Sequence, residues 1–137
     1  EEDHILILQP TVPFRPLEEI KEILKLYFNA LEKNFKSFVS LVDSGDYHPF
    51  RQKRLLSDGS CISYIDQGCE DLRPRQNLPK TFLRSGSYYI CPVSDLKKNK
   101  SILPPPTFGY IHKEFIPVNI DNKNDLLLAE IQLKEFE

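Results

Sequence analysis

The hydrophobic pattern opens with four consecutive aliphatic residues, 5–8, followed at once by the polar, proline-bracketed stretch 9–15. An uninterrupted aliphatic run of this kind is typical of a strand buried on both faces of a sheet. Ligands of open α/β sheets bind beyond the carboxyl ends of the strands, so Gln9, Thr11 and Arg15 are candidates for ligand contact. The alternative is an ordinary turn, in which these side chains bond only backbone groups or solvent.

Helical periodicity begins directly after this stretch. Apolar residues recur at helical spacing from Leu17 to Leu31, with charged residues between them, and predict an amphipathic helix that ends near Asn34. Residues 37–42 then have strand character. A strand, a helix and a second strand in this order form a crossover unit, which is right-handed and joins parallel strands in nearly all cases. We therefore expect an α/β fold.

Between residues 47 and 89 the pattern changes to that of hairpins. Short alternating stretches at 54–56 and 61–65 flank a turn, which predicts a pair of antiparallel strands. Residues 66–79 carry charges, two prolines and a glycine without periodicity, so we expect an irregular arm.

The rest of the chain alternates short strands and helices. Either Asp121 or Asn122 is expected to cap the last helix at its amino terminus. The expected elements are a strand at 82–91, a short helix at 95–101, a strand around 110–111, an extended segment at 115–120 and an amphipathic helix at 126–136.

Composition narrows the class of protein. The 137 residues suffice for one core, and a strand that looks central so near the start indicates part of a larger domain. A net charge of −2, without a basic stripe, gives no support to a nucleic-acid partner, and no apolar run is long enough to span a membrane. Three cysteines without metal-type spacing favour a reducing, cytoplasmic location.

Candidate chemistry rests on charged side chains. Asp121 is a plausible Mg²⁺ ligand because that cation prefers carboxylate oxygen, although the same residue could simply cap a helix. Four arginines could clamp a carboxylate or phosphate, or could be solvated charges: Arg51, Arg73, Arg75 and Arg84.

Five stretches, in order, resemble the motifs of the CMP-sialic acid synthetases, also called acylneuraminate cytidylyltransferases. The first, Leu-Ile-Leu-Gln-Pro-Thr-Val-Pro-Phe-Arg, ends at Arg15 and is similar to that family's Leu-Leu-Gln-Pro-Thr-Ser-Pro-Leu-Arg motif. The others are Tyr-His-Pro-Phe-Arg at 47–51, Ile-Asp-Gln-Gly at 65–68, the stretch 73–89 that ends in Arg-Ser-Gly-Ser-Tyr-Tyr, and Asn-Ile-Asp at 119–121.

This resemblance implies a fold, a reaction and partners. The fold would be a partial Rossmann-like nucleotidyltransferase sheet in three α/β/α layers, forming a single partial domain over 1–137. Residues 47–89 would be an inserted hairpin arm through which the protein forms a homodimer. The reaction would transfer CMP from CTP to the anomeric oxygen of a nonulosonic acid, with release of pyrophosphate.

The same resemblance implies roles for individual residues. Gln9, with Arg15 in the same loop, would contact the nucleotide or the sugar, and Arg75 and Tyr89 would hold the sugar acid. Arg51 stands where many relatives have lysine. Asp121 would hold Mg²⁺, beside an asparagine, Asn119, at a position that is usually aspartate.

Two departures from the family pattern leave a second interpretation open. The asparagine is one, and the other is that the family's amino-terminal strand and nucleotide loop do not occur in these 137 residues. The chain could therefore be a non-catalytic dimerisation or sugar-acid-binding remnant of the fold. A cytidylyltransferase for the eight-carbon acid of lipopolysaccharide is a related reading, which the Arg-Ser-Gly-Ser-Tyr-Tyr motif disfavours. The sequence does not distinguish sialic, legionaminic and pseudaminic acids.

Overall fold

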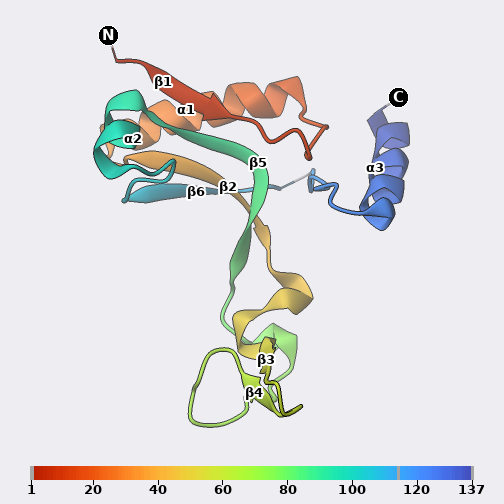
Figure 1. Cartoon of the computed structure of the whole chain (residues 1–137). Helices are drawn as coiled ribbons and strands as arrows, with labels where there is room; N and C mark the ends of the chain where they lie inside the picture. Colours follow the sequence, from red (N-terminus) through yellow and green to blue (C-terminus); the bar gives the residue numbers. More distant parts are fainter. Residues whose placement is uncertain (1, 114, 137) are drawn as a thin grey trace. The chain divides into compact units, whose positions relative to one another are not determined.

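The computed structural model describes residues 2–113 and 115–136. Over these residues the chain is a mixed α/β structure with three α-helices and a four-stranded mixed sheet of strand order β1-β5-β2-β6 (Figure 1). Strands β3 and β4 form a separate antiparallel pair. The elements are β1 (His4–Ile7), α1 (Leu17–Glu32), β2 (Ser37–Asp43), β3 (Lys53–Leu55), β4 (Cys61–Ser63), β5 (Phe82–Pro92), α2 (Val93–Asn99), β6 (Thr107–Ile111) and α3 (Lys123–Phe136).

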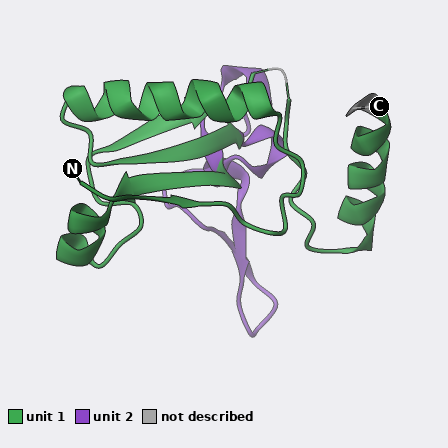
Figure 2. Ribbon diagram, turned by 90° about the horizontal axis from the view of Figure 1, so that it is seen from above, with its two compact units in different colours: residues 1–42, 84–137 green, residues 43–83 purple. Residues whose placement is uncertain are grey.

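The chain divides into two compact units, which Figure 2 colours separately. Unit 1 comprises residues 1–42 and 84–137, and unit 2 comprises residues 43–83. The three helices belong to unit 1, and the β3–β4 hairpin belongs to unit 2. The insertion that we expected at 47–89 therefore ends earlier, because residues 84–89 are part of β5 in unit 1.

The core of unit 1 forms where α1 packs on the sheet. Ile23 and Tyr27, one helical turn apart, are buried against Phe38 of β2. Phe38 stacks on Phe108 of β6 with ring centroids 5.6 Å apart. Each fully buried side chain of this size contributes about 1.5–3 kcal/mol through the apolar surface that it removes from water. The predicted helix and the strand that follows it are thus confirmed.

The first strand differs from the expectation. β1 lies at one end of the strand order and pairs antiparallel with β5, so it is an edge strand and not a central one. Its residues alternate between exposed and half-buried, and Leu6 is 37% exposed. A run of four aliphatic residues does not reveal how many neighbours a strand has, so the expectation of burial on both faces was wrong.

The last helix begins earlier than its apolar pattern indicated. Asn122 Oδ1 accepts hydrogen bonds from the backbone N–H groups of Asn124 (2.8 Å) and Asp125 (3.1 Å). The carboxylate of Asp125 accepts in return from the N–H groups of Asp121 and Asn122. This reciprocal capping box satisfies N–H groups that a helix start leaves without partners. Asn122 is therefore the cap, and the carboxylate of Asp121 takes no part in it.

Candidate functional site

The loop after β1, residues 9–15, is held by main-chain contacts in unit 1. The N–H group of Val12 donates to the carbonyl oxygen of Gln9 at 3.1 Å, which closes a tight turn. The Val12 side chain is fully buried and anchors the middle of the loop. The carbonyl of Thr11 accepts a hydrogen bond from the N–H of Ile120 at 2.8 Å. Two of the candidate motifs, residues 9–15 and 119–121, therefore lie side by side.

Arg15 links the start of this loop to strand β5. Its Nη2 donates to the carbonyl of Gln9 at 2.7 Å, and its Nε donates to the carbonyl of Ser87 at 3.3 Å. The guanidinium lies 5.9 Å from the centre of the Tyr88 ring, within reach of a cation–π contact. Partial burial lowers the pKa of Arg15, which the negative charge of Glu19 opposes. In this structure Arg15 binds the chain's own carbonyl groups.

Gln9 occupies a space that exists because residue 86 is glycine. Gly86 in β5 has φ of +79°, a conformation that other residues rarely adopt. A Cβ at this position would overlap Oε1 of Gln9. The glycine of the Arg-Ser-Gly-Ser-Tyr-Tyr motif thus provides the seat for the Gln9 carboxamide, which brings a third motif to the same loop.

The Asn119–Asp121 segment places an amide beside a carboxylate. Asn119 Nδ2 donates to Asp121 Oδ2. Asn119 Oδ1 is buried and has no hydrogen-bond partner in the described part of the chain. Asp121 is exposed. Mg²⁺ is commonly held by one or two carboxylates together with substrate phosphates and water, so Asp121 fits as one ligand of such a site. The Asn119 group that faces its carboxylate is the amide nitrogen, which does not bind a cation. The described residues include no group of three or more histidine, cysteine, aspartate or glutamate side chains that could bind a metal.

Two of the predicted arginines meet in unit 2. Arg51 and Arg75 both place Nη1 near Oδ1 of Asp46, at 3.3 and 3.4 Å. Arg75 also lines a cavity of about 270 Å³ together with Lys80 and His48. His48 Nδ1 accepts from the N–H of Phe50, so its Nε2 carries the proton and donates to the carbonyl of Pro79 at 2.9 Å. The lining thus combines two cations, Arg75 and Lys80, with one carboxylate, Asp43.

Tyr89 lies within β5, opposite Ile7 of β1, and is only 5% exposed. It therefore belongs to the same strand as Gly86 and Ser87, and its register partner Ile7 is the last residue of β1, the strand that leads into the loop. Its predicted role in holding a sugar acid rests on resemblance, since its exposed surface is small.

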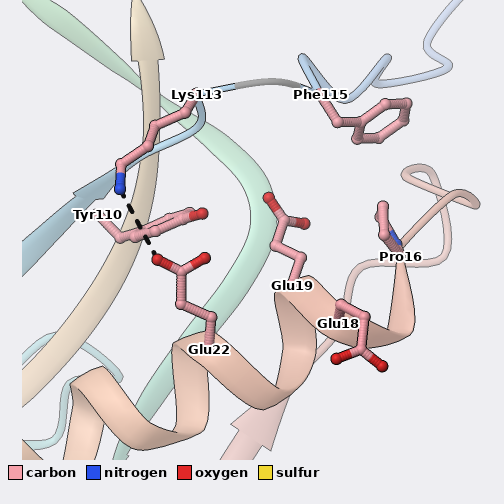
Figure 3. A pocket seen from close by; sticks show the side chains of 7 residues that line it. All are labelled: Pro16, Glu18, Glu19, Glu22, Tyr110, Lys113 and Phe115. Atoms are coloured by element: carbon pink, nitrogen blue, oxygen red, sulfur yellow. Dashed lines mark ion pairs between the residues drawn. The ribbon is translucent and has the colours of Figure 1, made fainter.

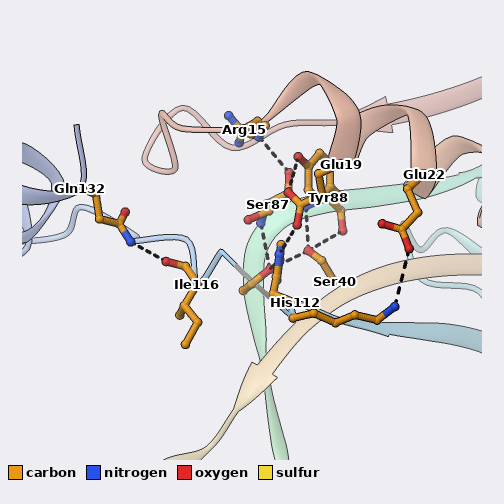
Figure 4. A network of polar contacts seen from close by, with 11 residues as sticks. Arg15, Glu19, Glu22, Ser40, Ser87, Tyr88, His112, Ile116 and Gln132 are labelled. Atoms are coloured by element: carbon orange, nitrogen blue, oxygen red, sulfur yellow. Dashed lines mark hydrogen bonds and ion pairs between the residues drawn. The ribbon is translucent and has the colours of Figure 1, made fainter. Parts of the chain in front are cut away.

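A buried hydrogen-bond cycle in unit 1 was not expected from the sequence. It runs from the Tyr88 hydroxyl to Glu19 (3.0 Å), from Glu19 to His112 Nδ1 (2.7 Å), from His112 Nε2 to Ser85 Oγ (3.0 Å) and from there to Ser40 Oγ (2.6 Å). Ser40 Oγ closes it by accepting from the N–H of Tyr88 at 2.9 Å (Figure 4). We call these five residues the Tyr88 cycle.

The Tyr88 cycle contains serine, histidine and glutamate in contact, yet it is not a nucleophilic site. The His112 side chain is fully buried and Ser85 is 7% exposed, so a substrate could not reach the serine hydroxyl. Burial raises the pKa of Tyr88, and the charge of Glu19 raises it further, so the phenol stays protonated and donates. The sequence signal for one member of the cycle is Ser40, a polar residue inside the otherwise apolar run 38–42.

A cavity of about 290 Å³ lies beside the first turns of α1 (Figure 3). Glu22 and Lys113 form an ion pair of 3.8 Å across it, above the ring of Tyr110. Three glutamates and one lysine make its wall mostly negative, which disfavours a phosphate or carboxylate ligand. Its lining residues are Pro16, Glu18, Glu19, Glu22, Tyr110, Lys113 and Phe115.

Comparison with models of known protein families finds no match for this chain. Within the described ranges, none of the helices has both the length and the apolar character needed to cross a bilayer.

Proposed function

We propose that this chain is part of a cytidylyltransferase that transfers CMP from CTP to a nonulosonic acid. In that reaction the anomeric oxygen of the sugar bonds to the α-phosphorus of CTP, and the bond from this phosphorus to the pyrophosphate leaving group breaks. One observation supports the proposal most: residues 9–15, 86–87 and 119–121, which resemble three motifs of that family, gather around one loop of unit 1. The four-stranded sheet would be part of a Rossmann-like, three-layer fold.

Residue roles follow from this placement. The Gln9 carboxamide, seated on Gly86, would contact the nucleotide or sugar, with Tyr89 close by in β5. Arg75, half exposed in a cavity that it lines together with Lys80, would pair with the carboxylate of the sugar acid, with Arg51 beside it. Arg15 would act on the loop and not on the ligand, since its guanidinium is bonded to Gln9 and Ser87.

Asp121 would hold Mg²⁺, and Asn119 would keep the Asp121 carboxylate in place through the hydrogen bond from its Nδ2. When bound, this ion would supply positive charge against the charge that develops on the phosphates. An amide in place of a second carboxylate carries no negative charge, so the protein's own contribution to metal affinity would be weaker than in relatives with two aspartates.

We also propose that the protein forms a homodimer through residues 47–83, the part of the expected arm that lies in unit 2. Large apolar side chains of unit 2 are exposed, among them Leu55 and Leu72 at 74% and 85%. A single two-stranded hairpin is marginally stable by itself in water, so a surface that covers these side chains would stabilise it.

The second candidate function is a non-catalytic sugar-acid-binding or dimerisation module of the same fold. Asn119 favours it, because the replacement of a carboxylate weakens a metal site before it weakens sugar binding.

One experiment separates these functions. Sialic acid is titrated into the chain and into its Arg75→Ala variant to measure binding. Formation of CMP-sialic acid from CTP is measured with the protein that the full open reading frame encodes. Loss of a charge-assisted hydrogen bond should weaken binding by about tenfold or more in Arg75→Ala. Arg54→Ala, an exposed arginine on the neighbouring hairpin, is the control and should bind normally.

Product formation supports the enzyme. Binding without product from sialic, legionaminic or pseudaminic acid supports the module. Absence of binding of all three acids, together with absence of product, contradicts both the enzyme and the sugar-acid-binding module and leaves only dimerisation, which sedimentation tests.

A further inference from the structure

The conformation of the Gln9–Arg15 loop depends on groups that lie beneath it. Arg15 fixes the carbonyl of Gln9, and the same carbonyl accepts the N–H of Val12. The guanidinium in turn lies over the ring of Tyr88 and bonds to the carbonyl of Ser87. The position of the loop therefore depends, through Arg15, on the Tyr88 side chain of β5.

Tyr88 is itself held at both ends. Its hydroxyl donates to Glu19 of α1, and its N–H donates to Ser40 of β2. His112 and Ser85 connect those two partners and complete the cycle. Because the cycle is closed, displacing any member disturbs the support of Tyr88 from both sides.

We propose that Arg15 and the Tyr88 cycle are positioning residues, which set the Gln9 carboxamide for ligand contact without touching the ligand. The proposal rests on the function proposed above, in which Gln9 contacts a sugar acid or nucleotide. Arg15 is not a ligand contact in this account, because two of its N–H groups are bonded to main-chain carbonyls. Within the cycle His112 is fully buried, and Glu19, which borders the cavity beside α1, is already bonded to Tyr88 and His112.

Three variants of the full chain test this. Arg15→Lys keeps the charge but loses the geometry that binds two carbonyls. Tyr88→Phe keeps the aromatic ring below Arg15 and removes the hydroxyl that reaches Glu19. Lys21→Ala is the matched control, because it removes an exposed ion pair with Glu18 in the first turns of α1, the helix that carries Glu19.

The first measurement needs no ligand. Amide hydrogen exchange at Val12 reports whether the loop opens, because this N–H is bonded to the carbonyl that Arg15 holds. Exchange should be about tenfold faster in Arg15→Lys, faster by a smaller factor in Tyr88→Phe, and unchanged in Lys21→Ala. Unchanged exchange in both test variants would overturn the proposal.

The second measurement follows the side-chain amide signals of Gln9 during titration with sialic acid. Arg15→Lys should weaken the affinity in step with faster exchange at Val12. Weaker affinity with unchanged exchange would instead make Arg15 a direct ligand contact and overturn the proposal. If the unaltered chain binds no sialic acid, the function proposed above fails, while Val12 exchange still decides the positioning role.

A further pair of variants covers the case in which Tyr88→Phe does not fold. Glu19→Gln can still accept from His112 and bond the Tyr88 hydroxyl, so Val12 exchange should stay within about twofold of the unaltered chain. Glu19→Ala can bond neither His112 nor Tyr88, so Val12 exchange should be faster in this variant than in the unaltered chain. Equal exchange in these two variants contradicts the role of the cycle.

Discussion

Unit 1 and unit 2 are stabilised in different ways. Unit 1 buries aromatic and aliphatic side chains between α1 and its sheet, around Phe38 and Tyr27. In unit 2, Leu78 is the one buried apolar side chain among the described residues, whereas Leu55 and Leu72 face solvent. A segment that exposes apolar residues while burying almost none gains little from the hydrophobic effect. Unit 1 therefore has a hydrophobic core of its own, whereas unit 2 derives little stability from buried apolar surface.

The polar contacts of unit 1 are also more buried than those of unit 2. Those of unit 1 include the buried Tyr88 cycle, in which each group has a defined partner. Those of unit 2 are largely exposed ion pairs, such as Lys53 with Glu70 and Arg73 with Asp71. Water and salt screen such pairs, so they orient loops more than they stabilise the fold.

The largest expected effect comes from the core of unit 1. Phe38→Ala should lower the free energy of unfolding by about 3–5 kcal/mol, because it removes a fully buried aromatic side chain and leaves a cavity. Leu72→Ala in unit 2 should change that of the monomer by less than about 0.5 kcal/mol, as expected for a side chain that is 85% exposed in the single chain. Denaturant unfolding measures both. Similar losses in the two variants would contradict the contrast between the units.

Next comes the glycine under Gln9. Gly86→Ala should cost about 1–3 kcal/mol of stability, because alanine is strained at positive φ. The added methyl group would also displace the Gln9 carboxamide, so sialic acid should bind more weakly than the loss of stability alone explains. Gly59→Ala is the control, since it is strained in the same way but has open space around its Cβ position. Equal sialic acid affinity in both variants would argue against the seat at Gly86.

A smaller effect is expected at the exposed surface of unit 2. Leu55→Asp should raise the dissociation constant of the proposed homodimer by about tenfold, because a charge must then be desolvated in the interface. Sedimentation as a function of concentration measures this constant. Ser57→Asp introduces the same charge at the hairpin turn and serves as the control. A monomer at all concentrations would contradict the homodimer itself.

The smallest effect is the response of unit 2 to acid. Hydrogen bonds from Arg73 lower the pKa of Asp71 from its ordinary value of 3.8 to about 2. A pKa that is lower in the folded state makes a stabilising contribution that is complete above about pH 4 and is lost as the pH falls toward 2. The backbone and side-chain NMR signals of Arg73 should shift in that window. Asp71→Asn should remove the shift, and a shift between pH 5 and 7 would contradict it.

The sequence predicted the elements of this fold better than their arrangement. Helix α1 follows from the spacing of Ile23, Tyr27 and their neighbours, which is a local property. The edge position of β1 depends on pairing with β5, more than eighty residues away, and no local pattern encodes it. The Tyr88 cycle was missed for the same reason, because it joins single polar residues from four segments that share no sequence spacing. For the candidate site, the composition of loop 9–15 indicated ligand contact, but only the structure assigned Arg15 to the main chain.

The placement of unit 2 in the chain also bears on how fast the sheet can form. Strands β2 and β5 are neighbours in the sheet, yet all of residues 44–81 lie between them in sequence. Closing a loop of about 40 residues instead of about five spans three doublings of length, which costs roughly 2 kcal/mol of chain entropy. Ser44 and Thr81 are hydrogen-bonded at 3.0 Å, so a short turn could join the same two strands. We therefore expect β2 and β5 to pair more slowly than they would if a short turn joined them, because the insertion must be closed first.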